Sequence, residues 1–211
     1  YKPSGCTLPP KPDTSEELRV PSADEPPLLG TDMAANGFGT ILSVWQHGPD
    51  AIGSSVYNGL GWSAPQMIPA GRGAHDPHVA FTGATEAVAV WTETDLTDDA
   101  PPDLTVEDAM RRRRIAAATW DGAGWSEPVA LTEPSLGEGG VALAGCPMWR
   151  PSCAEGGKAA VAVWERNLSD DFAARNLRLY TSYFTGDAWS TPEPLVPDGP
   201  ETDILPQVAF L

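Results

Sequence analysis

The chain has 211 residues, with 29 acidic against 13 basic side chains and a formal net charge of -16. So acidic a chain lacks the basic surface that nucleic acids and anionic membranes attract, which excludes both as partners. No run approaches the ~20 apolar residues of a membrane helix, so no membrane span is expected. The charge suits a secreted, highly soluble protein, or one from a salty habitat.

Residues 1–30 are rich in proline and have little apolar periodicity. This composition predicts an extended arm or linker, polyproline-like where it is ordered. Two interpretations remain open. The segment is either an arm that straps onto a neighbouring protein or onto the body of the chain, or a disordered leader.

One turn sequence occurs three times, at 57–65, 120–128 and 184–192. Each copy has an aromatic residue, a polar residue, a glycine and then Trp-Ser-x-Pro, which is typical of a β-hairpin. The tryptophans lie 63 and then 64 residues apart, so the chain is a repeat protein. We expect the glycines to make the turns and the tryptophans to fill gaps between repeats; stacking of the indoles on sugar rings is the alternative. These residues are Gly59, Gly122, Gly186, Trp62, Trp125 and Trp189.

Strand-like runs surround each turn. Second strands are predicted at 41–45, 87–91 and 160–164, where small and β-branched residues are typical of strands buried on both faces. A first strand is clearest at 77–81 and has a near copy at 206–210. Each unit is therefore predicted to be a four-stranded antiparallel sheet, the blade of a β-propeller, in an all-β chain. A β-sandwich is the alternative.

The predicted propeller array spans residues 31–211. Its blades are expected at 31–70, 75–133 and 146–197, and a further blade is expected to begin at 204–211. About three blades do not close a ring, because propellers have at least about four. We therefore expect missing sequence or other subunits to complete the ring.

Two insertions, 93–114 and 166–176, are expected on one rim of the array, where binding functions usually concentrate. Within the first, Thr105 and Asp108 are spaced to cap a helical turn over 104–110. The arginines at 111–114 are expected to be neutralised by the acids that precede them. An anionic partner and a protease-sensitive site are the alternatives.

The repeated turn resembles a degenerate Asp-box, the turn motif of sialidase-like β-propellers, over about residues 33–211. Asp121 fits the motif's aspartate, whereas Asn58 and Thr185 replace it in the other copies. The resemblance implies a propeller that is either a glycoside hydrolase or a lectin with sugar pockets between blades. For a hydrolase the resemblance implies an arginine cluster, a tyrosine nucleophile with a supporting glutamate, and an aspartate acid/base. This set has no match here, so no catalytic residue is assigned.

Several other residues are candidates for binding. Exposed aromatic and cationic side chains predict a ligand site at Trp149, Arg150, Arg166 and Arg175. Acidic loops offer the oxygens that Ca²⁺ prefers, at Asp95, Asp98, Asp99, Asp170 and Asp171; a solvated acidic loop is the alternative. The His75–His78 segment is expected to be a turn before a strand, with a metal site as the alternative.

Cys146 and Cys153 bracket a short proline-containing loop, which predicts a local disulfide and an oxidising compartment. Two buried thiols are the alternative, and Cys6 has no assigned role. Together these features predict a secreted, periplasmic or cell-surface module without catalysis, for ligand or glycan binding or for protein assembly. Its expected partners are glycans, other subunits or copies of itself, with Ca²⁺ as the one candidate cofactor. The alternatives are a fragment of a sialidase-like glycoside hydrolase and a structural subunit of an extracellular fibre or complex.

Overall fold

The computed structural model describes residues 30–95, 105–146, 159–169, 171, 176–196 and 206–209. These residues form three four-stranded antiparallel sheets, each with its strands in chain order. The first sheet contains β1 (Thr31–Ala35), β2 (Ile41–Gln46), β3 (Ala51–Tyr57) and β4 (Gln66–Pro69). The second contains β5 (His75–Phe81), β6 (Ala87–Thr94), β7 (Arg113–Trp120) and β8 (Val129–Ala130). The third contains β9 (Gly139–Gly145), β10 (Ala160–Asn167), β11 (Leu177–Phe184) and β12 (Glu193–Pro194).

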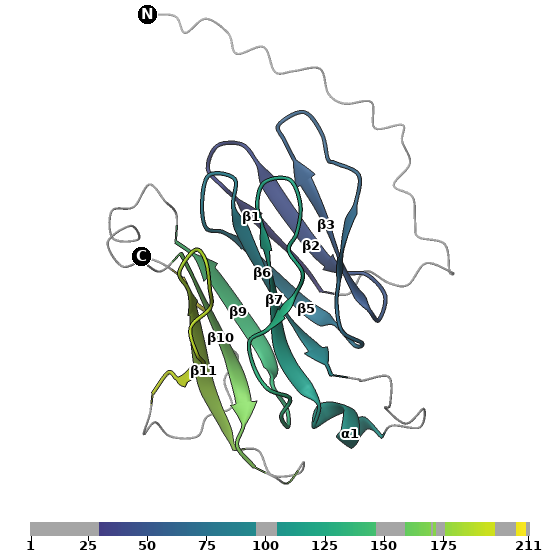
Figure 1. Ribbon diagram of the computed structural model, residues 1–211, viewed down its shortest axis with the longest axis vertical. Helices are drawn as coiled ribbons and strands as arrows, with labels where there is room; N and C mark the ends of the chain where they lie inside the picture. Colours follow the sequence, from purple (N-terminus) through teal and green to yellow (C-terminus); the bar gives the residue numbers. More distant parts are fainter. Residues whose placement is uncertain are drawn as a thin grey trace, which may run out of the picture.

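The sheets lie side by side, with the second between the other two (Figure 1). One apolar core joins the first and second sheets and includes Leu42, Val44, Trp91 and Ala116. Another joins the second and third sheets and includes Val90, Ala117 and Trp164. Because β6 contributes to both cores, it is buried along its whole length, as its run of small and β-branched residues predicted.

The first strands of the sheets converge. β5 contacts β1 on one side and β9 on the other. Small residues permit this approach: a Cβ atom at Gly145 of β9 would lie only 2.1 Å from the carbonyl oxygen of Phe81 in β5. Four-stranded sheets that are packed face to face, with their first strands together, are blades of a β-propeller-type array, so the predicted fold class is confirmed.

The structure differs from two predicted boundaries. The third sheet begins at Gly139, not at 146, because the glycine-rich run before Cys146 pairs with β10 as its first strand. In the further blade expected at 204–211, the described residues 206–209 form no strand. No described strand lies beside them to complete a ladder, but Val208 packs on Val161 and Val163 of the third sheet.

The repeated turns have the expected backbone. Gly59, Gly122 and Gly186 have φ values of 91°, 95° and 105°, a left-handed conformation that a side chain would strain. In the central copy, Asp121 Oδ1 accepts hydrogen bonds from the backbone N–H groups of Ala123 and Gly124, at 2.9 and 2.8 Å. These contacts hold the turn that precedes Trp125.

The tryptophans of the turns occupy equivalent places but different surroundings. Trp125 packs on the core between the first and second sheets, and Trp189 on the core between the second and third. Trp62 bridges to Tyr57 at the end of β3 and has 51% of its surface exposed. Two of the three indoles therefore fill gaps between neighbouring sheets, and the third has no described sheet to pack against.

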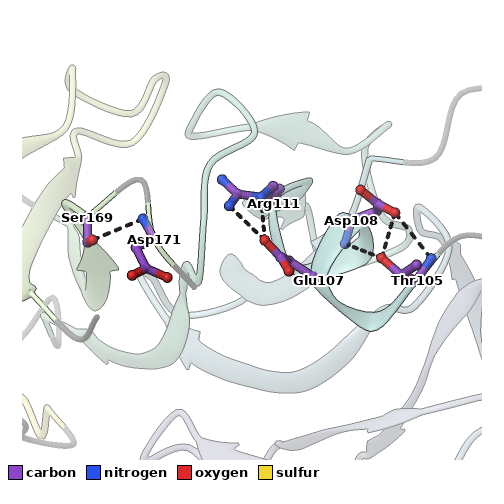
Figure 2. A network of polar contacts seen from close by, with 6 residues as sticks. All are labelled: Thr105, Glu107, Asp108, Arg111, Ser169 and Asp171. Atoms are coloured by element: carbon purple, nitrogen blue, oxygen red, sulfur yellow. Dashed lines mark hydrogen bonds and ion pairs between the residues drawn. The ribbon is translucent and has the colours of Figure 1, made fainter. Parts of the chain in front are cut away.

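The insertion after β6 contains the one helix of the described ranges, α1 (Val106–Met110). Its capping box is the predicted one: Thr105 Oγ1 accepts from Asp108 N, and the Asp108 carboxylate accepts from Thr105 N (Figure 2). In the described part of the chain, no helix has the length and hydropathy needed to cross a bilayer.

Candidate functional site

A groove of about 610 Å³ opens between the outer strands of the second and third sheets. One wall is β7 and the segment through β8, and the other wall is the turn and segment that follow β11. Aromatic and apolar side chains, including Trp189, Phe184 and Val129, form its floor and walls. Val129 is an apolar side chain left 52% exposed there.

Polar groups surround this apolar surface. Glu127 and Asp187 supply carboxylates, and Thr119 and Thr191 supply hydroxyls. The hydroxyls of Ser126 and Ser190 also line the groove but are hydrogen-bonded to the backbone of their own turns. No Lys, Arg or His is among the described residues that line the groove. The arrangement combines an aromatic wall with convergent hydrogen-bonding groups, which is the usual composition of a small-molecule site.

A second cluster lies on the rim, where Glu93 is held almost fully buried at 2% exposure. Trp91 Nε1 and the backbone N–H of Gly71 donate to Glu93 Oε2, at 2.7 and 2.8 Å. Arg114 approaches Glu93 Oε1 at 2.7 Å and Asp95 Oδ1 at 3.1 Å. The carboxylate therefore links β6 and β7 to the connection between the first two sheets, which is a structural role.

A similar pair lies one sheet further on. Glu138 is fully buried, and its Oε1 lies 2.7 Å from Arg166 Nε. Burial raises the pKa of Glu138, although hydrogen bonding from Thr132 and the nearby Arg166 charge act in the opposite direction. The Arg166 guanidinium also lies over the ring of Tyr180, 4.9 Å from its centroid. Arg166 is thus held by its own sheet.

A third cluster joins the first strands of two sheets. His78 Nδ1 lies 3.5 Å from Asp32 Oδ2, and His78 Nε2 lies 3.6 Å from Asp76 Oδ1. Asp76 has a φ of 53°, unusual for a residue with a side chain, within a bulge of β5. The segment is therefore part of a strand and not the turn that the sequence suggested. It bridges β1 and β5.

These two carboxyls raise the pKa of His78 to about 9, mainly through hydrogen bonding to Asp32 and then to Asp76. Because the folded-state pKa lies above the ordinary value of 6.5, the bridge contributes its full stability below pH 6.5 and loses it as pH rises through 9. We expect the stability difference between the protein and His78→Gln to shrink over that window. Urea unfolding from pH 6 to 10 measures it, and a difference that is constant with pH would contradict the assignment.

The structure describes some of the predicted site residues and not others. Trp149, Arg150, Arg175, Asp98, Asp99, Asp170 and Cys153 lie outside the described residues. Of those inside, Arg166 and Asp95 take part in the ion pairs above, and Asp171 N donates to Ser169 Oγ at 3.0 Å (Figure 2). Within the described ranges, no group of three or more His, Cys, Asp or Glu side chains is placed to hold a metal ion. Cys146 is buried at the end of β9, and its pairing with Cys153 stays a prediction.

Two of the four arginines at 111–114 are neutralised by preceding acids, as expected. Arg111 pairs with Glu107 one helical turn earlier at 2.8 Å (Figure 2), and Arg114 pairs with Glu93 and Asp95. The described parts of the two insertions are linked by the loop before β9. In this loop Gly137 N donates to Met110 O, and a Cβ atom at Gly137 would contact Asn167. Glu93, Glu138, Glu127 and the Asp32–His78 pair were not among the predicted site residues.

Comparison with known proteins bears on the fold. Neither a protein-family model nor a curated protein sequence matches the chain. Among solved structures, the fucose-specific lectin from Aleuria aurantia is similar, with a TM-score of 0.50 and 15% identity over 81% of this chain and 46% of the lectin. The Hadza microbial sialidase Hz136 is also similar, with a TM-score of 0.46 and 17% identity over 76% of this chain and 36% of the sialidase. This chain spans less than half the length of either protein.

Proposed function

We propose that this chain is a propeller module that binds glycans, with its site in the groove between the second and third sheets. The observation that carries the proposal is the groove itself, where the exposed Val129 and the half-buried Trp189 lie beside two carboxylates and several hydroxyls. A sugar presents an apolar ring face and a rim of hydroxyls, so it matches such a surface. The lectin with the similar fold binds fucose, which is consistent with this use of the fold.

The negative charge of the groove favours neutral ligands over acidic ones. Glu127 and Asp187 accept hydrogen bonds from sugar hydroxyls but repel a carboxylate, and the described lining has no basic residue to offset that repulsion. The module is therefore proposed to take neutral sugars in preference to acidic ones such as sialic acid.

The first strands of the sheets favour binding over hydrolysis. The described strands β1, β5 and β9 consist mainly of alanine, valine, glycine, aspartate and histidine, and they contain no arginine or tyrosine. The described Arg114 and Arg166, on the rim, are held in ion pairs. The arginine cluster and tyrosine that the resemblance to sialidases implied are thus not gathered at the described inner edge.

A glycan array followed by titration calorimetry tests the proposal. We expect the protein to bind neutral monosaccharide glycosides, with methyl α-L-fucoside as the first probe, and to ignore sialylated ones. The double variant Glu127→Gln, Asp187→Asn should weaken binding at least about tenfold, because each lost charge-assisted hydrogen bond contributes about 1.5–3 kcal/mol. Glu133→Gln, an exposed carboxylate outside the groove, serves as the matched control and should bind normally. A protein that binds no neutral sugar would refute the proposal.

The remaining expectations support a role outside the cytoplasm. The high negative charge, the repeat turn interpreted as a degenerate Asp-box, and the predicted Cys146–Cys153 disulfide are consistent with a secreted or surface-attached module that also contacts other subunits. Thiol counting by mass spectrometry before and after reduction tests the disulfide directly.

A further inference from the structure

The two junctions between neighbouring sheets have equivalent strands and turns, but they differ in the side-chain hydrogen bonds that cross them. The first junction lies between the first and second sheets, and the second junction lies between the second and third. Trp125 enters the first and Trp189 enters the second. They are equivalent by position, since Trp125 bridges to Trp120 and Trp189 bridges to Phe184 at the ends of their sheets' third strands.

Two polar side chains bridge the first junction. Trp125 Nε1 donates to Ser54 Oγ at 2.8 Å, and Gln66 Nε2 donates to the carbonyl of Ala123 at 3.5 Å. Ser54 and Gln66 are register partners on β3 and β4, so they act from one place on the first sheet.

The second junction has no such bridge among the described residues. The register places of Ser54 and Gln66 are occupied in the second sheet by Ala117 and Val129, which are again partners of one another. Ser54 and Ala117 are equivalent because each pairs with the valine just before the tryptophan of its sheet's second strand. Ser54 pairs with Val44 of β2, and Ala117 pairs with Val90 of β6. The methyl group of Ala117 offers no acceptor. The Nε1 of Trp189 is buried and has no hydrogen-bond partner in the described structure.

Ala117 and Val129 both line the groove. We propose that Ala117 and Val129 determine where this protein binds its ligand: they leave the second junction unbridged and open to a neutral sugar, whereas Ser54 and Gln66 bridge the first. This inference rests on the proposed glycan-binding function. It adds that two register positions select the binding junction.

The double variant Ala117→Ser, Val129→Gln transfers the bridge to the second junction. We expect the serine hydroxyl to accept the Trp189 indole N–H, which shifts its NMR resonance downfield and slows its exchange with solvent. The same variant should bind methyl α-L-fucoside, or whichever neutral methyl glycoside binds best on the array, at least tenfold more weakly. Val106→Gln introduces the same glutamine side chain at an exposed position outside the groove and is the matched control, which should retain binding.

The reciprocal variant Ser54→Ala, Gln66→Val removes the bridge from the first junction. It should leave the Trp125 indole without its acceptor and open a second binding site. That site should be weaker than the first, because Ala64 and Ala123 stand at the places of Glu127 and Asp187. Normal binding by the Ala117→Ser, Val129→Gln protein, or an unchanged stoichiometry in the reciprocal variant, would overturn the inference while the glycan-binding function stood. A wild-type protein that binds no neutral sugar would overturn both.

Discussion

Replacing Glu93 with alanine is expected to lower the free energy of unfolding by about 3–5 kcal/mol, the typical result of removing one partner from a buried ion pair. The loss is large because Glu93 satisfies three groups at once: the Arg114 guanidinium, the Trp91 indole and the backbone N–H of Gly71. After the substitution, the indole and the Gly71 N–H face a buried site without an acceptor, and Arg114 keeps only its pair with Asp95. Urea unfolding at pH 7 measures the change.

Two further substitutions sharpen this test. Glu93→Gln retains an oxygen acceptor but no charge for Arg114, so we expect an intermediate loss. Glu107→Ala removes an acid that also pairs with an arginine, but at 51% side-chain exposure, and it should cost about 0.5 kcal/mol or less. Equal losses at Glu93 and Glu107 would contradict the structural role of the rim cluster.

Replacing Gly145 with alanine is expected to separate the first strands of the second and third sheets. The new Cβ atom would lie 2.1 Å from the Phe81 carbonyl oxygen and 3.0 Å from the Ala80 Cβ atom, so the backbone must move. Overpacking of this kind costs about 1–3 kcal/mol, and more where backbone and not a flexible side chain is in the way. Thermal unfolding measures the loss.

Gly124→Ala is the matched control for this substitution. Gly124 lies in a repeated turn, where an added Cβ atom would meet nothing within 4 Å, and its φ is not in the left-handed region. Its stability should change by no more than about 0.5 kcal/mol. If Gly145→Ala were equally harmless, the close approach of β5 and β9 would be wrong.

Much of the fold was predictable because burial determines the composition of its central strands. β2, β6 and β10 are runs of small and β-branched residues next to a tryptophan, and the repeated turn marks the end of each third strand. β9 was missed since no comparable signal precedes it: its glycines and alanines suit a crowded inner position and resemble a loop in sequence. β8 and β12 have only two residues each, too short for a periodic pattern.

The candidate site was less predictable because it depends on contacts between sheets. The groove needs the relative placement of β8 and the turn after β11, which no local pattern specifies. Glu93 was interpreted as part of an acidic insertion, yet it lies two residues after Trp91 and so on the same face of β6. That period-two spacing is the signal that identifies it as buried. Asp32 and His78 meet across two sheets and carry no such signal.

The first and third sheets flank the second, and this arrangement determines which of the described sheets separates most easily. The second sheet is covered on both faces, whereas the other two are covered, among the described residues, chiefly on the face toward it. Among the described sheets each unit is stabilised by its immediate neighbours, so detaching the first or the third sheet breaks one described interface while detaching the second breaks two. A ligand that spans the second and third sheets would therefore stabilise the third sheet against local unfolding and leave the first sheet as the least stable of the three.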